Sequence, residues 1–179
     1  MSDIAHMYRP PAVASENEIP SEVAEYLDGT DLLSKTQAVR VSTVDEQGWP
    51  HASLLSAGDM LAVPPAQIRF LIFAGSVTTR NLVRDGRVTA TISFEGGMWE
   101  LRFRARRMTE ASPDASLVCF EATLETARFH AVPYASVTSG ITFAPNEPEL
   151  VLSRWERQIR ALRDAGEQMK PRRVEDPIG

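Results

Sequence analysis

The sequence predicts one domain of the mainly β class, in which antiparallel strands form a closed or partly closed barrel with peripheral helices. Its 179 residues suit a single domain, because a chain of this length buries roughly two-thirds of the surface that it exposes when unfolded. Apolar and polar residues alternate along several short segments, as they do in half-buried strands. Turn-forming pairs such as GG separate neighbouring segments and favour antiparallel pairing. We expect about six strands.

The first elements are a short helix and three strands. A helix should begin with Ser21 as its N-cap and end near Gly29. The segment AVRVSTV, from Ala38 to Val44, alternates as a strand does, and WPHASLLSA after the DEQG turn forms its antiparallel return. A third strand should span Gln67 to Ala74 (QIRFLIFA), and its near-continuous apolar character indicates that both of its faces are covered.

The second half of the chain begins with a predicted hairpin. RVTATISFE alternates strictly, and MWELRFRARRM returns after a turn at Gly96 and Gly97. From Ser112 onward the apolar period becomes helical, so we expect a helix there. YASVTSGITF, after Pro133, is the sixth strand candidate. The segment ELVLSRWERQIRALRDAG should form an amphipathic helix that ends at Gly166.

The order of these elements divides the chain into three parts. Residues 1–20 contain several prolines and no apolar period, so we expect an N-terminal arm. Residues 21–166 form the predicted domain, and residues 167–179 form a flexible tail. Because a sheet this apolar needs closure or a partner to cover its edges and outer face, we expect a homodimer.

Composition limits the function classes. The formal net charge of −5 argues against a nucleic-acid-binding protein, since such proteins concentrate Lys and Arg. No segment resembles a secretory signal or a membrane span, and the single cysteine, Cys119, fits a reducing compartment. We therefore expect a cytoplasmic protein that binds neither membranes nor nucleic acid. The three histidines have no metal-binding spacing, so we expect no metal.

The segment GSVTTRNLVRDGR carries the main candidate site. Ser76, Thr78, Thr79 and Arg80 follow directly behind the third strand, where the next helix should begin. The free backbone amides of a first helical turn attract anions, and hydroxyls and a guanidinium add donors. Two interpretations are open here: a phosphate site, or a surface helix capped by Ser76 with solvated arginines.

Three motifs in this order resemble the pyridoxamine 5′-phosphate oxidase-like, FMN-binding split-barrel family. They are VSTVDEQGWPHASLL, IRFLIFAGSVTTRNLVRDGRV, and TATISF with its aromatic and basic return strand. The resemblance covers roughly residues 38–107. It implies a six-stranded antiparallel Greek-key split barrel, a homodimer, and FMN bound between the subunits.

The resemblance also implies which residues contact the cofactor. The strand after Pro-His, which contains His51, Ser53 and Leu54, lines the flavin ring in that family, and the end of the third strand, at Phe73 and Ala74, leads into the phosphate turn. The turn itself points to the phosphate ligands already named. The family commonly has a lysine in this turn, at the position of Thr78, and here Arg80 follows two residues later.

The function that the resemblance implies is that of an FMN-dependent oxidoreductase acting on a small molecule. No acid–base pair is evident, so the catalytic residues are not identified; His51 is more typical of a structural or ligand contact. The alternatives are a noncatalytic carrier or sensor of flavin or haem, and a reductase that uses the deazaflavin F420.

Overall fold

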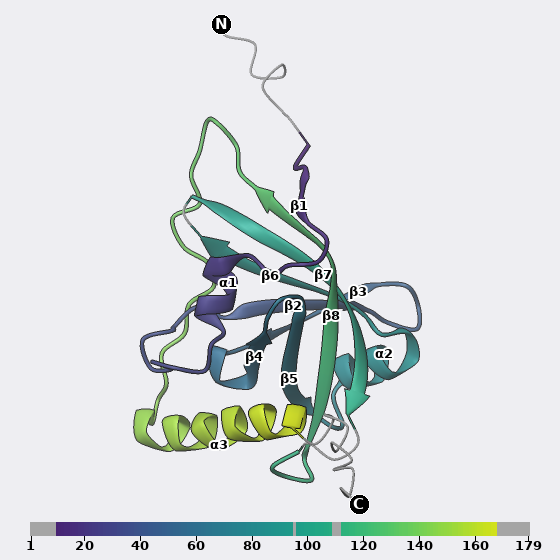
Figure 1. The fold of residues 1–179 in the computed structure, drawn as a ribbon, viewed down its shortest axis with the longest axis vertical. Helices are drawn as coiled ribbons and strands as arrows, with labels where there is room; N and C mark the ends of the chain where they lie inside the picture. Colours follow the sequence, from purple (N-terminus) through teal and green to yellow (C-terminus); the bar gives the residue numbers. More distant parts are fainter. Residues whose placement is uncertain (1–9, 95, 109–111, 168–179) are drawn as a thin grey trace, which may run out of the picture.

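The computed structural model describes residues 10–94, 96–108 and 112–167, and it places eight strands in one curved antiparallel sheet (Figure 1). The strands are β1 (Val13–Ser15), β2 (Val39–Val44), β3 (Pro50–Leu55), β4 (Met60–Val63), β5 (Gln67–Phe73), β6 (Arg87–Phe94), β7 (Gly97–Met108) and β8 (Leu117–His130). The order along the sheet is β3, β2, β6, β7, β8, β5, β4, and β1 pairs with β8 outside this path. This is a mainly antiparallel half-barrel, as the sequence predicts.

In the described part of the chain, four helical segments lie around the sheet. They are α1 (Ser21–Tyr26), the 3-10 turn η2 (Ala57–Asp59), α2 (Val77–Asp85) and α3 (Pro148–Glu167). Figure 1 shows α3 lying across one end of the barrel, where it contacts η2, β4 and β5, while α2 packs beside β2 and β3. None of the helices in the described part of the chain has the length and apolarity that a bilayer crossing requires.

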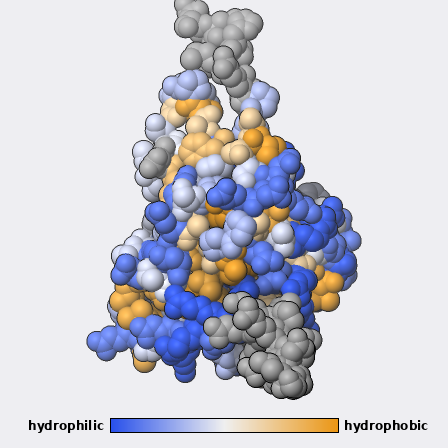
Figure 2. All heavy atoms as spheres, viewed as in Figure 1, coloured by the Kyte–Doolittle hydropathy of each residue, from blue (hydrophilic) through white to orange (hydrophobic). Residues whose placement is uncertain are grey.

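The core lies inside the curved sheet and under α3. Phe70 of β5 stacks on Phe120 of β8 with ring centroids 5.6 Å apart. Five consecutive residues of β5 are buried, which confirms that both faces of this strand are covered. On α3, Trp155, Ile159 and Leu162 are almost fully buried and form the predicted apolar stripe. On the face drawn in Figure 2, apolar side chains also reach the surface between polar ones.

The largest error of the sequence analysis concerns the segment after Ser112. The predicted helix is wrong, because Leu117–His130 forms β8. This strand pairs with β5 on one edge and with β7 on the other. Val118 to Ala122 are all buried, so both faces of the strand are covered and the alternation that identifies a half-buried strand disappears.

The predicted sixth strand is also absent. Between Pro133 and Phe143 the chain makes only isolated bridges, and most of its residues there are exposed. A segment exposed on both sides buries too little apolar surface to be held as a strand. Five of the six predicted strands are present, and β1, β4 and β8, which were not predicted, bring the sheet to eight strands. The proposed tail falls almost wholly outside the described residues, as do the first nine residues of the proposed arm.

Candidate functional site

The turn between β5 and α2 has the geometry that the sequence predicts for a helix start. Ser76 is the N-cap of α2, and its Oγ accepts a hydrogen bond from the backbone N–H of Thr79 at 3.0 Å. The hydroxyl of Thr79 donates in turn to the carbonyl oxygen of Phe73 at 2.7 Å, which ties the helix to the end of the strand. Gly86, with φ of 73°, ends the helix in the left-handed conformation.

The start of α2 offers donors to a ligand. The amides of Ser76, Thr79 and Arg80 have acceptors, namely the carbonyl oxygen of Phe73, the Oγ of Ser76 and the carbonyl oxygen of Ser76. The amides of Val77 and Thr78, in the first turn, have no acceptor within the helix. Both amides lie at the positive end of the helix dipole.

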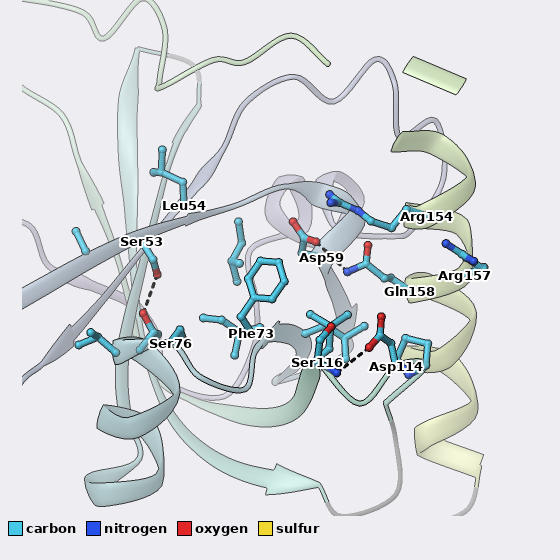
Figure 3. Close-up of a pocket in the computed structure, with 18 of the residues that line it drawn as sticks. Ser53, Leu54, Asp59, Phe73, Ser76, Asp114, Ser116, Arg154, Arg157 and Gln158 are labelled. Carbon is cyan, nitrogen blue, oxygen red and sulfur yellow. Dashed lines mark hydrogen bonds between the residues drawn. The ribbon is translucent and has the colours of Figure 1, made fainter. Parts of the chain in front are cut away.

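This helix start borders a cavity of about 790 Å³. Strand β3 contributes His51, Ser53 and Leu54 to its lining, β5 ends in it at Phe73, and α2 contributes Ser76 and Thr78. Helix α3 lines the opposite side through Arg154, Arg157 and Gln158 (Figure 3). In the close-up, Phe73 lies between Ser53 and Ser76 on one side and the α3 side chains on the other. The cavity thus has two polar ends and an apolar middle.

Six of the nine residues proposed from the sequence line this cavity: His51, Ser53, Leu54, Phe73, Ser76 and Thr78. Thr78 is 1% exposed, and its hydroxyl donates to the Oγ of Ser53 at 3.2 Å, so the start of α2 and strand β3 touch directly. All nine assignments remain predictions, because no ligand contact tests them.

The other three proposed residues, Ala74, Thr79 and Arg80, do not line the cavity. The N–H of Ala74 donates a hydrogen bond to the carbonyl oxygen of Ser116, and the hydroxyl of Thr79 donates to the carbonyl oxygen of Phe73. The exposed side chain of Arg80 donates from Nη1 to the carbonyl oxygen of Gly75 at 3.1 Å. Its guanidinium therefore stays within the turn.

Sequence reasoning missed the side of the cavity that α3 and η2 build. Gln158 is 4% exposed, and its Nε2 donates to Oδ1 of Asp59 at 3.1 Å. Oδ2 of Asp59 accepts from both the backbone N–H and the hydroxyl of Ser56. One signal was available in the sequence: a glutamine lies within the apolar stripe between Trp155 and Leu162, where helical spacing directs it inward.

The charges around the cavity balance. Its lining contains two carboxylates, Asp59 and Asp114, and two guanidiniums, Arg154 and Arg157. The N–H of Ser116, donating to Asp114, holds the pKa of that carboxyl below its usual value, and Arg157 adds a smaller lowering. Among the described residues, no group of three or more His, Cys, Asp or Glu side chains could hold a metal ion.

Comparisons with known proteins agree with the fold. No protein-family model matches the sequence. The chain is 29% identical over 150 residues to the protein named "Uncharacterized protein YclD" of Bacillus subtilis, covering 82% of this chain and 97% of that one.

Two of the solved structures that resemble the fold have TM-scores of 0.51 and 0.50. A Lactobacillus delbrueckii protein named "putative pyridoxamine 5′-phosphate oxidase" has a TM-score of 0.51 at 16% identity, covering 64% of this chain and 97% of its own. HupZ of Group A Streptococcus has a TM-score of 0.50 at 13% identity, covering 66% and 98%. At such identities the likeness concerns the fold alone. The chain therefore has the split-barrel fold of the pyridoxamine 5′-phosphate oxidase-like proteins, as its three sequence motifs predict.

Proposed function

We propose that the protein binds FMN in the cavity beside α2 and acts as an oxidoreductase on a small organic molecule. One observation carries this proposal: the N-terminus of α2 opens onto a cavity whose middle is apolar and whose size suits a cofactor. Ligand sites generally measure about 300–1,000 Å³ and combine an apolar lining with a few placed polar groups.

The phosphate of FMN belongs at the start of α2 in this proposal. The amides of Val77 and Thr78 supply two donors, and the hydroxyls of Ser76 and Thr78 can rotate to supply more. Each hydrogen bond to a charged group contributes about 1.5–3 kcal/mol, so two such bonds supply a large share of the roughly 8 kcal/mol of a micromolar affinity. Arg80 remains a predicted ligand, because its exposed side chain needs to exchange only one carbonyl contact to reach the phosphate.

The ring of FMN belongs in the apolar middle. Leu54 of β3 and Phe73 of β5 line that part and are 51% and 64% exposed. A ring lying against them would bury this surface. When bound, FMN supplies the hydride and electron chemistry, and the chain's own residues bind it, orient it and exclude water.

The homodimer is part of the same proposal. A second copy of the chain would cover whatever apolar surface the ring leaves open at Leu54 and Phe73. Light scattering on the purified protein measures the mass directly, and a mass of one chain at all concentrations would contradict the dimer. The expected compartment is the cytoplasm, because the one cysteine, Cys119, is free and buried.

The first test is the absorbance spectrum of freshly purified protein, followed by titration of the apoprotein with FMN and with riboflavin. FMN should bind at micromolar concentration or tighter, and riboflavin at least tenfold more weakly because it lacks the phosphate. Thr78→Val should weaken FMN severalfold and leave riboflavin unchanged. The matched control is Thr91→Val on β6, outside the cavity lining. Equal affinities for both flavins would refute the phosphate site, and no binding would refute the proposal.

Two alternatives remain beside this proposal. A noncatalytic carrier or sensor would bind flavin or haem without turnover, and no acid–base pair is evident from the sequence. The second alternative is a reductase that uses F420. It is favoured by the cavity lining at the start of α2, which in the described residues includes hydroxyls and amides but does not include Arg80. Turnover of a nicotinamide nucleotide with artificial acceptors separates enzyme from carrier, and competition between FMN and F420 separates the cofactors.

A further inference from the structure

The amide of Gln158 has a fixed orientation inside the cavity wall. Its Nε2 donates to Oδ1 of Asp59 at 3.1 Å, and Oδ2 of Asp59 is held by the N–H of Ser56 at 2.9 Å and its hydroxyl at 2.5 Å. The opposite orientation of the amide would place two acceptor oxygens 3.1 Å apart. Asp59 therefore determines which end of the amide faces away from it.

The oxygen of this amide has no donor among the residues that the structure describes. Oε1 of Gln158 is enclosed, and none of the described residues donates a hydrogen bond to it, although the side chain is 4% exposed and lines the cavity. A buried acceptor without a donor is costly, so such atoms usually have a partner in the functional state of a protein. A ligand in the cavity that carries an N–H or O–H could supply this donor, since Gln158 lines the cavity and Asp59 occupies the other end of the amide.

The charges nearby favour a neutral ligand edge over an anion. The two carboxylates of the cavity lining, Asp59 and Asp114, balance the charges of its two guanidiniums. One of these guanidiniums, that of Arg154, makes no ion pair within 4.0 Å with any described carboxylate. A guanidinium next to a fixed acceptor suits a ligand edge on which an N–H lies beside carbonyl oxygens. The pyrimidine edge of a flavin ring has this pattern, and haem has no N–H edge.

We propose that Gln158, oriented by Asp59, accepts a hydrogen bond from the ring N3–H of the bound flavin, and that Arg154 donates to the neighbouring carbonyl oxygen. This inference rests on the proposed function and deepens it, because it assigns the α3 side of the cavity to the ring edge. It includes F420 among the possible ligands, since that deazaflavin shares the edge, and it disfavours haem. Gln158 and Arg154 thus contact the ring, while Asp59 is a positioning residue.

The test uses FMN and N3-methyl-FMN as a pair of probes, because methylation removes the hydrogen that Gln158 should accept. The wild-type protein should bind FMN about tenfold more tightly than N3-methyl-FMN. Gln158→Met, which keeps the length of the side chain and removes the acceptor, should bind both probes equally. The control is Arg160→Met, on an exposed position of α3 outside the cavity lining, and it should keep the tenfold preference.

Each outcome decides between the two proposals. If the wild-type protein binds both probes equally, the assignment of Gln158 is refuted whether or not Gln158→Met folds. If Gln158→Met still prefers FMN over N3-methyl-FMN, another group accepts the N3–H hydrogen bond and the assignment is also refuted. If neither probe binds, the proposed function itself fails.

A second readout concerns Arg154. A cation at the ring edge stabilises the anionic reduced flavin relative to the oxidised form. Arg154→Met should lower the ratio of the affinities for reduced and oxidised flavin about tenfold, which corresponds to a fall of about 30 mV in the two-electron midpoint potential. The potential of Arg160→Met should equal that of the wild-type protein. An unchanged potential in Arg154→Met would remove Arg154 from the ring edge.

Discussion

Replacing Arg69 by methionine should destabilise the protein more than any exposed charge substitution. Arg69 is 8% exposed on β5, its Nε lies 3.0 Å from Oε2 of Glu121, and its Nη1 donates to the carbonyl oxygen of Leu162 at 3.1 Å. At 3.0 Å and an effective dielectric constant near 20, the Coulomb attraction is about 5 kcal/mol. Removing one partner of such a pair leaves the other charge buried, which typically costs about 3–5 kcal/mol.

The structure places the expected loss at the lower end of this range. Glu121 keeps a second cation in the variant, because Nη2 of Arg106 lies 2.6 Å from its Oε1. We therefore expect Arg69→Met to lower the free energy of unfolding by about 3 kcal/mol. The control is Arg104→Met, whose pair with Glu125 has a similar distance of 3.1 Å but side chains 53% and 48% exposed. That substitution should cost less than about 1 kcal/mol.

Urea unfolding followed by tryptophan fluorescence measures both losses. With a slope near 2 kcal/mol per molar urea, the Arg69→Met midpoint should fall by about 1.5 M and the control midpoint by less than about 0.5 M. Protein concentration must be equal in all samples, because a dimer would make stability concentration-dependent. Equal midpoints for the two variants would refute the claim that burial makes the Arg69 pair structural.

Three further outcomes test other parts of the molecule. Gly58→Ala should lower the melting temperature and change the near-ultraviolet circular dichroism, because an added Cβ would lie 2.0 Å from Cγ of Trp155; wild-type melting would contradict this contact. Burial raises the pKa of the Cys119 thiol to about 12, so iodoacetamide at pH 8 should label this thiol only as the protein unfolds, and rapid labelling of the folded protein would exclude the burial. For the same reason the free energy of unfolding should fall as the pH rises above the ordinary thiol pKa near 8.5. Arg80→Ala should weaken FMN at least tenfold while its melting temperature stays unchanged, and an unchanged dissociation constant would show that Arg80 is only a surface residue.

The parts of the fold that local signals specify could be predicted from the sequence. The start of α2 follows from a serine cap at Ser76, which the structure confirms. The β6–β7 hairpin follows from strict alternation on both sides of a glycine turn, and the structure pairs Phe94 with Gly97 there. In each case the residues that determine the element lie within it, so no distant contact was needed.

The central strand β8 could not be predicted in this way, because its environment comes from elsewhere in the chain. Its residues Val118–Ala122 are buried on both faces. Of its two sheet neighbours, β5 is distant in the sequence and β7 is separated from it by a loop. A short apolar segment with both faces buried has the same composition as a buried helix segment. Only the pairing on both edges distinguishes the two, and pairing is a tertiary property.

The same reasoning explains why half of the candidate site was missed. The residues around Ser76 are neighbours in sequence, whereas Gln158 reaches Asp59 only because α3 packs on η2. That packing depends on Gly58, since any larger residue would collide with Trp155. A single contact thus both anchors the C-terminal helix and brings Gln158 to the cavity. It follows that a ligand held by Gln158 should also stabilise the docking of α3, so cofactor binding and the stability of this helix are coupled.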